Sequence, residues 1–142
     1  MFYLAMTHEA LGNLSKALEL YQQAENLSPQ TSPQTAEIAV AYGRLLVSLG
    51  RVQDGIERER RAIEIYPKSR DAHYVLAKGL EQEGDFEHAT LEGELALTLP
   101  EANAGDAEIH FLLTRLYRKL NKPDLAEAHM EKFLALKKTT QK

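Results

Sequence analysis

The chain has 142 residues, enough for one compact domain or a short array of repeats but too few for a multidomain enzyme. Its 17 basic and 21 acidic side chains give a net charge of −4, which argues against a dedicated nucleic-acid-binding protein. No cysteine is present, so disulfide frameworks, thiolate zinc sites and cysteine nucleophiles are excluded. No apolar run is long enough for a membrane span. The first residues lack the features of a secretory signal, so we expect a cytoplasmic protein if Met1 is the true start.

Turn residues recur at a regular interval along the chain. Gly50 and Gly84 are 34 residues apart, and each lies between two segments with periodic apolar residues. Gly12 and Asn121 occupy the same kind of loop at slightly longer intervals. A proline follows each glycine after one helix length, and these prolines are Pro29, Pro67 and Pro100. Self-similarity of this kind indicates a repeat protein.

The segments between these turns have helical periodicity. Ala39, Tyr42, Gly43 and Leu46, for example, follow the spacing of one face of an amphipathic helix. Neither the alternation of apolar and polar residues that is typical of strands nor a hairpin turn signal is found. We therefore predict an all-α protein with helices over residues 1–11, 15–28, 34–49, 52–65, 69–83, 86–98, 106–120 and 123–138.

Short connections predict that these helices fold back in pairs as antiparallel hairpins. Small residues would allow a close approach where the two helices cross, and the expected pairs are Ala5 with Ala17, Gly43 with Gly55, Ala77 with Ala89 and Thr114 with Ala126. The four units cover residues 1–31, 36–69, 70–103 and 107–138 of a single domain, and residues 139–142 form a polar tail.

This register of small residues, tyrosines and prolines resembles the tetratricopeptide repeat family. The last unit carries it on Leu113, Thr114, Tyr117 and Ala126. The resemblance implies a right-handed superhelical array, an α-solenoid of about four helix-turn-helix repeats with the first truncated, and a noncatalytic scaffold for protein-protein interaction. An ordinary helical bundle with chance periodicity is the alternative. Where the family favours an aromatic residue on the second helix, the chain has Glu59 and Gly93, and looser contacts are expected there.

In the resembled family the first helix of each repeat lines a concave binding groove. The residues rotated toward that groove would be Glu37, Val40, Ala41 and Arg44, then Asp71, Tyr74, Val75 and Lys78, then Glu108, Phe111, Leu112 and Arg115. We predict partner binding by the apolar and basic rows within this set, namely Val40, Arg44, Tyr74, Lys78, Phe111 and Arg115. Aromatic side chains beside cations suit a peptide with apolar side chains and at least one carboxylate. Alternatively, the acidic and basic rows pair with each other across adjacent repeats.

The two ends of the chain suggest a second function. The truncated first helix would expose Phe2 and Tyr3, which are candidates for a self-association edge or for a contact with further repeats of a larger protein. Residues 107–142 contain eight basic and four acidic side chains, so this part carries +4 while the rest of the chain carries −8. Such asymmetry could steer an acidic partner or promote head-to-tail association, or it could reflect a solvated helix with a frayed tail.

Catalysis has little support in the sequence. Five histidines lie in different helices without the spacing of a metal site, and no phosphate-binding loop or nucleophile motif occurs. His73 and His110 occupy equivalent repeat positions, and we interpret them as packing residues. We predict no catalytic residue, metal or cofactor, no nucleic-acid partner and no membrane insertion, and we keep a homo-oligomer as a possible state.

Overall fold

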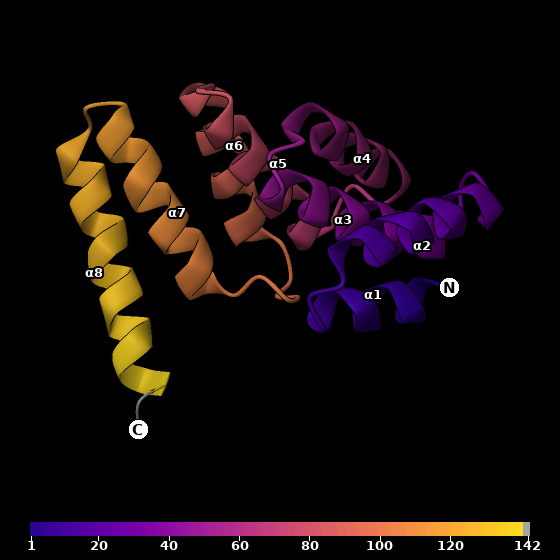
Figure 1. Ribbon diagram of the computed structural model, residues 1–142. Helices are drawn as coiled ribbons and strands as arrows, with labels where there is room; N and C mark the ends of the chain where they lie inside the picture. The colour runs from indigo at the N-terminus through magenta and orange to yellow at the C-terminus, as the bar shows by residue number, and fades with distance from the viewer. Residues whose placement is uncertain (141–142) are drawn as a thin grey trace. The chain divides into compact units, whose positions relative to one another are not determined.

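The computed structural model describes residues 1–140, and within that range it contains helices connected in pairs and no strand (Figure 1). The first helices of the pairs are α1 (Phe2–Ala10), α3 (Pro33–Ser48), α5 (Arg70–Gln82) and α7 (Asp106–Lys119). The second helices are α2 (Leu14–Leu27), α4 (Val52–Ile65), α6 (Phe86–Thr98) and α8 (Pro123–Thr140). The predicted all-α class of helix-turn-helix repeats is confirmed, and α1 is shorter than the other first helices, as expected.

The same turn closes every first helix. Gly12, Gly50 and Gly84 have φ angles of +83°, +84° and +82°, and Asn121 has a φ angle of 57°. These values lie in the left-handed region, which glycine and asparagine tolerate best. The amide of the next residue then bonds a carbonyl five residues earlier, as Arg51 N does to Leu46 O at 2.9 Å. The prediction that Asn121 occupies the glycine position of the repeat is confirmed.

Capping residues fix where several helices begin. The Ser32 side chain accepts a hydrogen bond from Thr35 N at 3.2 Å, and Ser69 accepts one from Ala72 N at 3.2 Å. Asp85 does the same for His88 N at 3.3 Å. A side chain that satisfies an unpaired amide in the first turn stabilises a helix by about 1 kcal/mol.

The chain divides into two compact units, Met1–Pro67 and Lys68–Lys142, each of which contains two hairpins. In the first unit, α1 contacts α2, α2 contacts α3, and α3 contacts α4. Its core joins Ala5 and Ala17, which are completely buried, to Tyr21 and Leu46. The assignment of the four hairpins to one domain stays a prediction.

In the second unit, α5 contacts α6, α6 contacts α7, and α7 contacts α8, while a smaller contact joins α5 to α7. The crossing residues Ala77, Ala89 and Thr114 are completely buried. The largest buried apolar side chains of this unit are Leu76 of α5 and, from α7, Ile109, Leu112, Leu113 and Leu116.

Two expectations on packing are wrong. The Glu59 side chain is fully buried, and it occupies space that is free because residue 43 is a glycine. A Cβ at Gly43 would lie 2.3 Å from Glu59 Oε1. A Cβ at Gly93 would lie 2.9 Å from Leu113 Cδ2, so α7 fills the place of the missing aromatic side chain. Both positions are therefore closely packed rather than loose.

The predicted polar tail also differs. Helix α8 continues to Thr140, two residues beyond the predicted end, because residues 139 and 140 extend its hydrogen-bonded ladder. The remainder of the predicted tail, residues 141 and 142, lies outside the described residues.

Candidate partner-binding face

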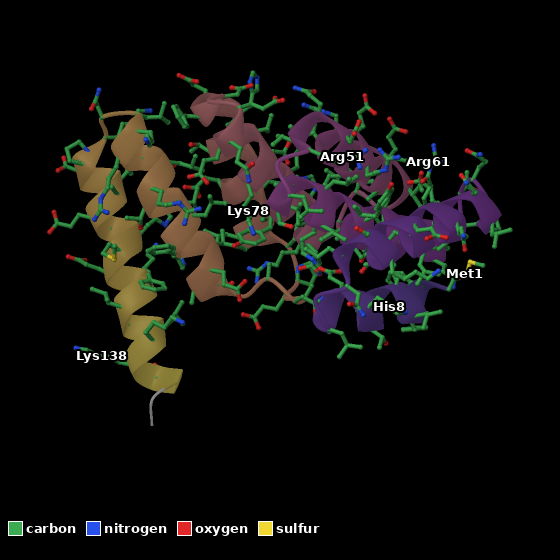
Figure 2. All side chains as sticks on the ribbon, viewed as in Figure 1. Met1, His8, Arg51, Arg61, Lys78 and Lys138 are labelled. Carbon is green, nitrogen blue, oxygen red and sulfur yellow. The ribbon has the colours of Figure 1, made fainter. Side chains whose placement is uncertain are left out.

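The second unit brings four of the predicted binding residues together on α5 and α7. Tyr74 and Lys78 lie on α5, and Phe111 and Arg115 lie on α7, the two first helices that contact each other. Phe111 is 40% exposed, and Tyr74 and Lys78 are partly exposed. We call this set the α5–α7 face. Figure 2 shows the side chains along the helices and labels Lys78 on α5.

Each aromatic ring of the α5–α7 face lies beside a cation. The Lys78 ammonium is 5.1 Å from the centre of the Tyr74 ring, and the Arg115 guanidinium carbon is 5.1 Å from the centre of the Phe111 ring. At such distances a cation is attracted by the negative face of the ring. Phe111 also lies 5.0 Å from the ring of Phe133 in α8. The face thus offers apolar area and positive charge side by side.

Arg115 is held in place by an acidic residue of α5. Its Nε donates to Glu81 Oε2 at 3.1 Å, and its Nη2 donates to Glu81 Oε1 at 3.0 Å. These hydrogen bonds raise the pKa of Arg115 above its ordinary value, and burial opposes them in part. This bidentate contact fixes the plane of the guanidinium, so Arg115 is oriented over Phe111 before a partner binds.

The electrostatic surroundings keep Tyr74 neutral. Burial raises the pKa of its phenol, and the negative charge of Glu108 raises it further, while Arg115 acts in the opposite direction. The hydroxyl is therefore protonated at neutral pH and can donate a hydrogen bond.

The first unit repeats part of this arrangement. Arg44 Nη2 donates to Glu9 Oε1 at 3.2 Å and to Oε2 at 3.3 Å, and Tyr21 donates to Glu9 Oε1 at 2.6 Å. Val40, four residues before Arg44 on α3, is half-buried. Phe2 packs against the core, with its ring 6.2 Å from that of Tyr21, whereas Tyr3 is 73% exposed. Of the two predicted edge residues, only Tyr3 is therefore widely available.

Two of the three cations of the basic row pair with acidic residues that no sequence pattern indicated. Arg44 and Arg115 bind glutamates 35 and 34 residues earlier, on the first helix of the preceding hairpin. Glu9 of α1 and Glu81 of α5 each lie three residues before the left-handed glycine that follows their helix. The same position of α3 holds the apolar residue Val47 instead of a glutamate. Lys78 forms no ion pair with any residue in the described part of the chain. It is therefore the cation of the row whose charge is least compensated.

Parts of the predicted groove set have other roles. Asp71 Oδ1 accepts a hydrogen bond from Ala104 N at 2.8 Å, and Oδ2 accepts one from Asn103 N at 3.3 Å. Asp71 thus fixes the loop before α7 instead of facing a groove. The expectation for Ala41, Val75 and Leu112 is also wrong, because these side chains are no more than 7% exposed. They lie on the side of the first helix that packs against other helices.

The structure also contains a buried chain of polar side chains that no sequence pattern indicated. His110 Nδ1 lies 2.8 Å from His129 Nδ1, and His129 Nε2 lies 3.1 Å from Glu94 Oε1. Tyr117 donates to the same Glu94 oxygen at 2.7 Å and stacks on His129 with the planes 10° apart. Burial lowers the pKa of His110, and the nearby His129 lowers it further. The packing role predicted for His110 fits its burial.

A common spacing could have revealed this chain. His110 and His129 are 19 residues apart, as are His73 and Glu92, whose Nδ1 and Oε2 atoms lie 2.5 Å apart. Both pairs bridge the two helices of one hairpin at the same repeat position.

A polar cleft of about 380 Å³ lies in the first unit, lined by residues from the end of α2, the start of α3 and α4. Arg58 Nε lies 3.3 Å from Glu25 Oε2, and Arg61 Nη2 donates to the amide oxygen Oε1 of Gln30 at 2.5 Å. Because Arg58 is paired with Glu25 and Arg61 is hydrogen-bonded to Gln30, and because no aromatic side chain is among the described residues that line the cleft, it is a weaker candidate than the α5–α7 face.

The described residues offer little for other classes of site. Between residues 1 and 140, no three acidic or histidine side chains lie together in an arrangement that could hold a metal ion. None of the helices that the structure describes combines the length and the apolar character that a membrane crossing requires.

Comparison with known proteins agrees with this architecture. Models of the tetratricopeptide repeat match residues 1–31, 40–107 and 109–142, which together cover nearly the whole chain. No curated protein matches the chain significantly in sequence.

Several solved structures are similar in fold. A crystal structure of MamA has a TM-score of 0.82 with 21% identity, and the alignment covers 99% of this chain and 78% of that chain. MamA from Desulfovibrio magneticus RS-1 has a TM-score of 0.82 with 15% identity, covering 99% of this chain and 76% of the other. At such identities the similarity shows the all-helical repeat fold.

Proposed function

Because the chain belongs to the tetratricopeptide repeat family, we propose that it is a noncatalytic protein-interaction scaffold that binds a segment of a partner protein on the α5–α7 face. The observation that carries this proposal is the pairing of a partly exposed aromatic ring with a cation at two successive repeat positions, Tyr74 with Lys78 and Phe111 with Arg115.

The chemistry of the face favours one class of partner. Aromatic and arginine side chains dominate the energetics of protein interfaces, because they bury a large area and keep specific polar contacts. Phe111 and Tyr74 would receive apolar side chains of the partner. A carboxylate of the partner would bind Lys78, since Glu81 already neutralises Arg115.

Val40 and Arg44 occupy the same repeat positions in the first unit, and we propose them as a weaker contact region there. Val40 offers less area than an aromatic ring, and Glu9 already binds Arg44. The partner is therefore an acidic and apolar segment, either extended or helical, that depends most on the second unit.

Quantitative capture from a lysate of the source organism tests the proposal. The immobilised chain is compared with a Tyr74→Ala/Phe111→Ala variant, and Tyr66→Ala, which removes a 53% exposed aromatic residue elsewhere, is the matched control. We expect the double variant to lose the captured proteins and the control to retain them, with equal helicity by circular dichroism.

A charge variant separates the two parts of the face. Lys78→Glu should weaken capture most at low salt, because screening reduces the contribution of an exposed charge. Lys68→Glu, at an exposed loop position, is its control. Equal capture by the parent, the double variant and Lys78→Glu would reject the α5–α7 face as the binding site.

A further inference from the structure

The exposed side of α1 corresponds to a side that is buried in later hairpins. Tyr3 and Leu4 are 73% and 50% exposed. At the same repeat positions, Ala41 and Tyr42 of α3 are 7% and 4% exposed, and Leu112 and Leu113 of α7 are completely buried. In those hairpins the second helix of the preceding hairpin covers this side, since α2 contacts α3 and α6 contacts α7.

These two internal contacts define what kind of helix fits on α1. Tyr21 of α2 meets Tyr42 of α3 with ring centres 5.8 Å apart. Gly93 of α6 lies against Leu113 of α7, whose Cδ2 would be 2.9 Å from a Cβ at Gly93. Tyr21 and Gly93 occupy one repeat position, and the residue at that position of α8 is Met130.

Helix α8 offers a matching uncovered side. Met130 is partly exposed, and Leu134, one turn further on the same side, is 51% exposed. A polar contact between α6 and α7 also has equivalent residues on α8 and α1. Tyr117 of α7 donates to Glu94 of α6 at 2.7 Å, and the corresponding residues are His8 of α1 and Glu131 of α8. Met1 and His8, both labelled in Figure 2, mark the two ends of the α1 helix that would be covered.

The charges of the two end hairpins are complementary. Residues 1–31 contain three glutamates and one lysine, a net charge of −2, whereas residues 107–142 carry eight basic and four acidic side chains, a net charge of +4. Opposite charges accelerate association and disfavour the pairing of two α1 faces or two α8 faces.

We propose that the chain associates head to tail with a second copy of itself, α8 of one copy packing on α1 of the next in the way that α2 packs on α3 and α6 on α7. Met130 and Leu134 of one copy then cover Leu4 and Tyr3 of the other. Such a contact is heterologous, because it joins two different surfaces, so a dimer held by one contact keeps one free α1 face and one free α8 face. These free faces allow further copies to be added or a ring to close.

Sedimentation equilibrium of the purified chain over a range of concentrations tests the proposal. We expect the average mass to rise from the 16.0 kDa of one chain to at least twice that value as the concentration increases. A mass of one chain at every concentration would overturn the proposal and leave the α1 face to a different protein. A plateau at two copies that persists in a Met130→Glu variant would also overturn it, because such a dimer would not use α8.

Two single variants and their mixture identify the surfaces. Leu4→Glu removes the α1 face and keeps the α8 face, while Met130→Glu does the reverse, so each alone should associate at least ~10-fold more weakly. Their mixture should form a dimer of one copy of each and go no further. Leu91→Glu, at a 66% exposed position on α6, is the control and should associate like the parent.

Tyr3→Glu and Leu134→Glu replace either variant if circular dichroism shows lost helicity, because both positions are more than half exposed. A mixture that stays monomeric, or single variants that associate as strongly as the parent, would contradict the pairing of α8 with α1.

Discussion

Gly43 and Gly55 face each other where α3 crosses α4. A Cβ at Gly43 would lie 2.9 Å from the Gly55 carbonyl oxygen, and a Cβ at Gly55 would lie 2.8 Å from the Gly43 carbonyl oxygen. Real Cβ atoms do not approach backbone oxygens so closely, so the two helices are in contact through their main chains. This close crossing also leaves room for the buried Glu59 side chain beside Gly43.

Gly43→Ala should therefore lower the free energy of unfolding by about 1–3 kcal/mol, because overpacking at the crossing outweighs the better helix propensity of alanine. Urea denaturation measures the change. Gly105→Ala is the control, since a Cβ there would be 3.9 Å from its nearest neighbour, and it should have little effect. A Gly43→Ala variant as stable as the parent would show that the helices can separate without cost.

The buried pair of His110 and His129 predicts a pH dependence of stability. Burial and the neighbouring histidine lower the pKa of His110 from its ordinary value of 6.5, so the folded state binds fewer protons than the unfolded state below that pH. The contribution to stability is complete above about pH 6.5 and is lost as the pH falls, with a slope of at most about 1.4 kcal/mol per pH unit. Denaturation at a series of pH values measures this slope.

Removing the His110 imidazole should reduce the pH dependence of the free energy of unfolding. His110→Gln is expected to reduce the slope between pH 6.5 and the lower pKa of the folded state, whatever its effect on absolute stability. His8→Gln, which changes an outer histidine that contacts Asn13 at 3.4 Å, is the control for the substitution itself. The same slope in His110→Gln and the parent would mean that other groups cause the pH dependence.

Substitution of Arg70 should strongly destabilise the protein, although Arg70 has no role in the proposed binding face. Its guanidinium is 2% exposed and donates to Ala96 O at 2.8 Å and to Ala104 O at 3.2 Å, with a further bond to Asp106. Arg70→Lys cannot reproduce this planar set of bonds, and we expect a loss of about 3 kcal/mol or more in the free energy of unfolding.

Hydrogen exchange distinguishes a local from a general effect of this change. Amides in residues 99–105, which Arg70 and Asp71 hold, should exchange faster in Arg70→Lys than in the parent. Arg51→Lys is the matched control, because Arg51 bonds Asp54 at 3.0 Å with a side chain that is 55% exposed. Similar melting temperatures for Arg70→Lys and the parent would contradict the structural role of Arg70.

Local signals made most of the fold predictable. The periodic apolar residues set the helices, and left-handed turns at Gly50 and Asn121 follow from residue type and spacing. The crossing of Gly43 with Gly55 was predictable because few other residues allow such proximity. These features depend on neighbours within one hairpin, which the sequence presents directly.

The binding face was only partly predictable, because it depends on how one hairpin sits on the next. Sequence spacing grouped Arg115 with Phe111, but it did not reveal that Glu81 of the preceding hairpin holds Arg115. It also placed Asp71 in a groove, although the loop before α7 folds back onto that carboxylate. Contacts between hairpins follow from the offset of stacked helices, which single-hairpin periodicity does not encode.

Hydrogen exchange of the chain with and without a captured partner tests the central claim most directly, namely that the α5–α7 face binds the partner. We expect slower exchange on binding in peptides from α5 and α7, and no such protection when Lys78→Glu/Phe111→Ala is mixed with the same partner at the same concentration. Protection confined to α1 or to α4, with α5 and α7 unchanged, would contradict the claim.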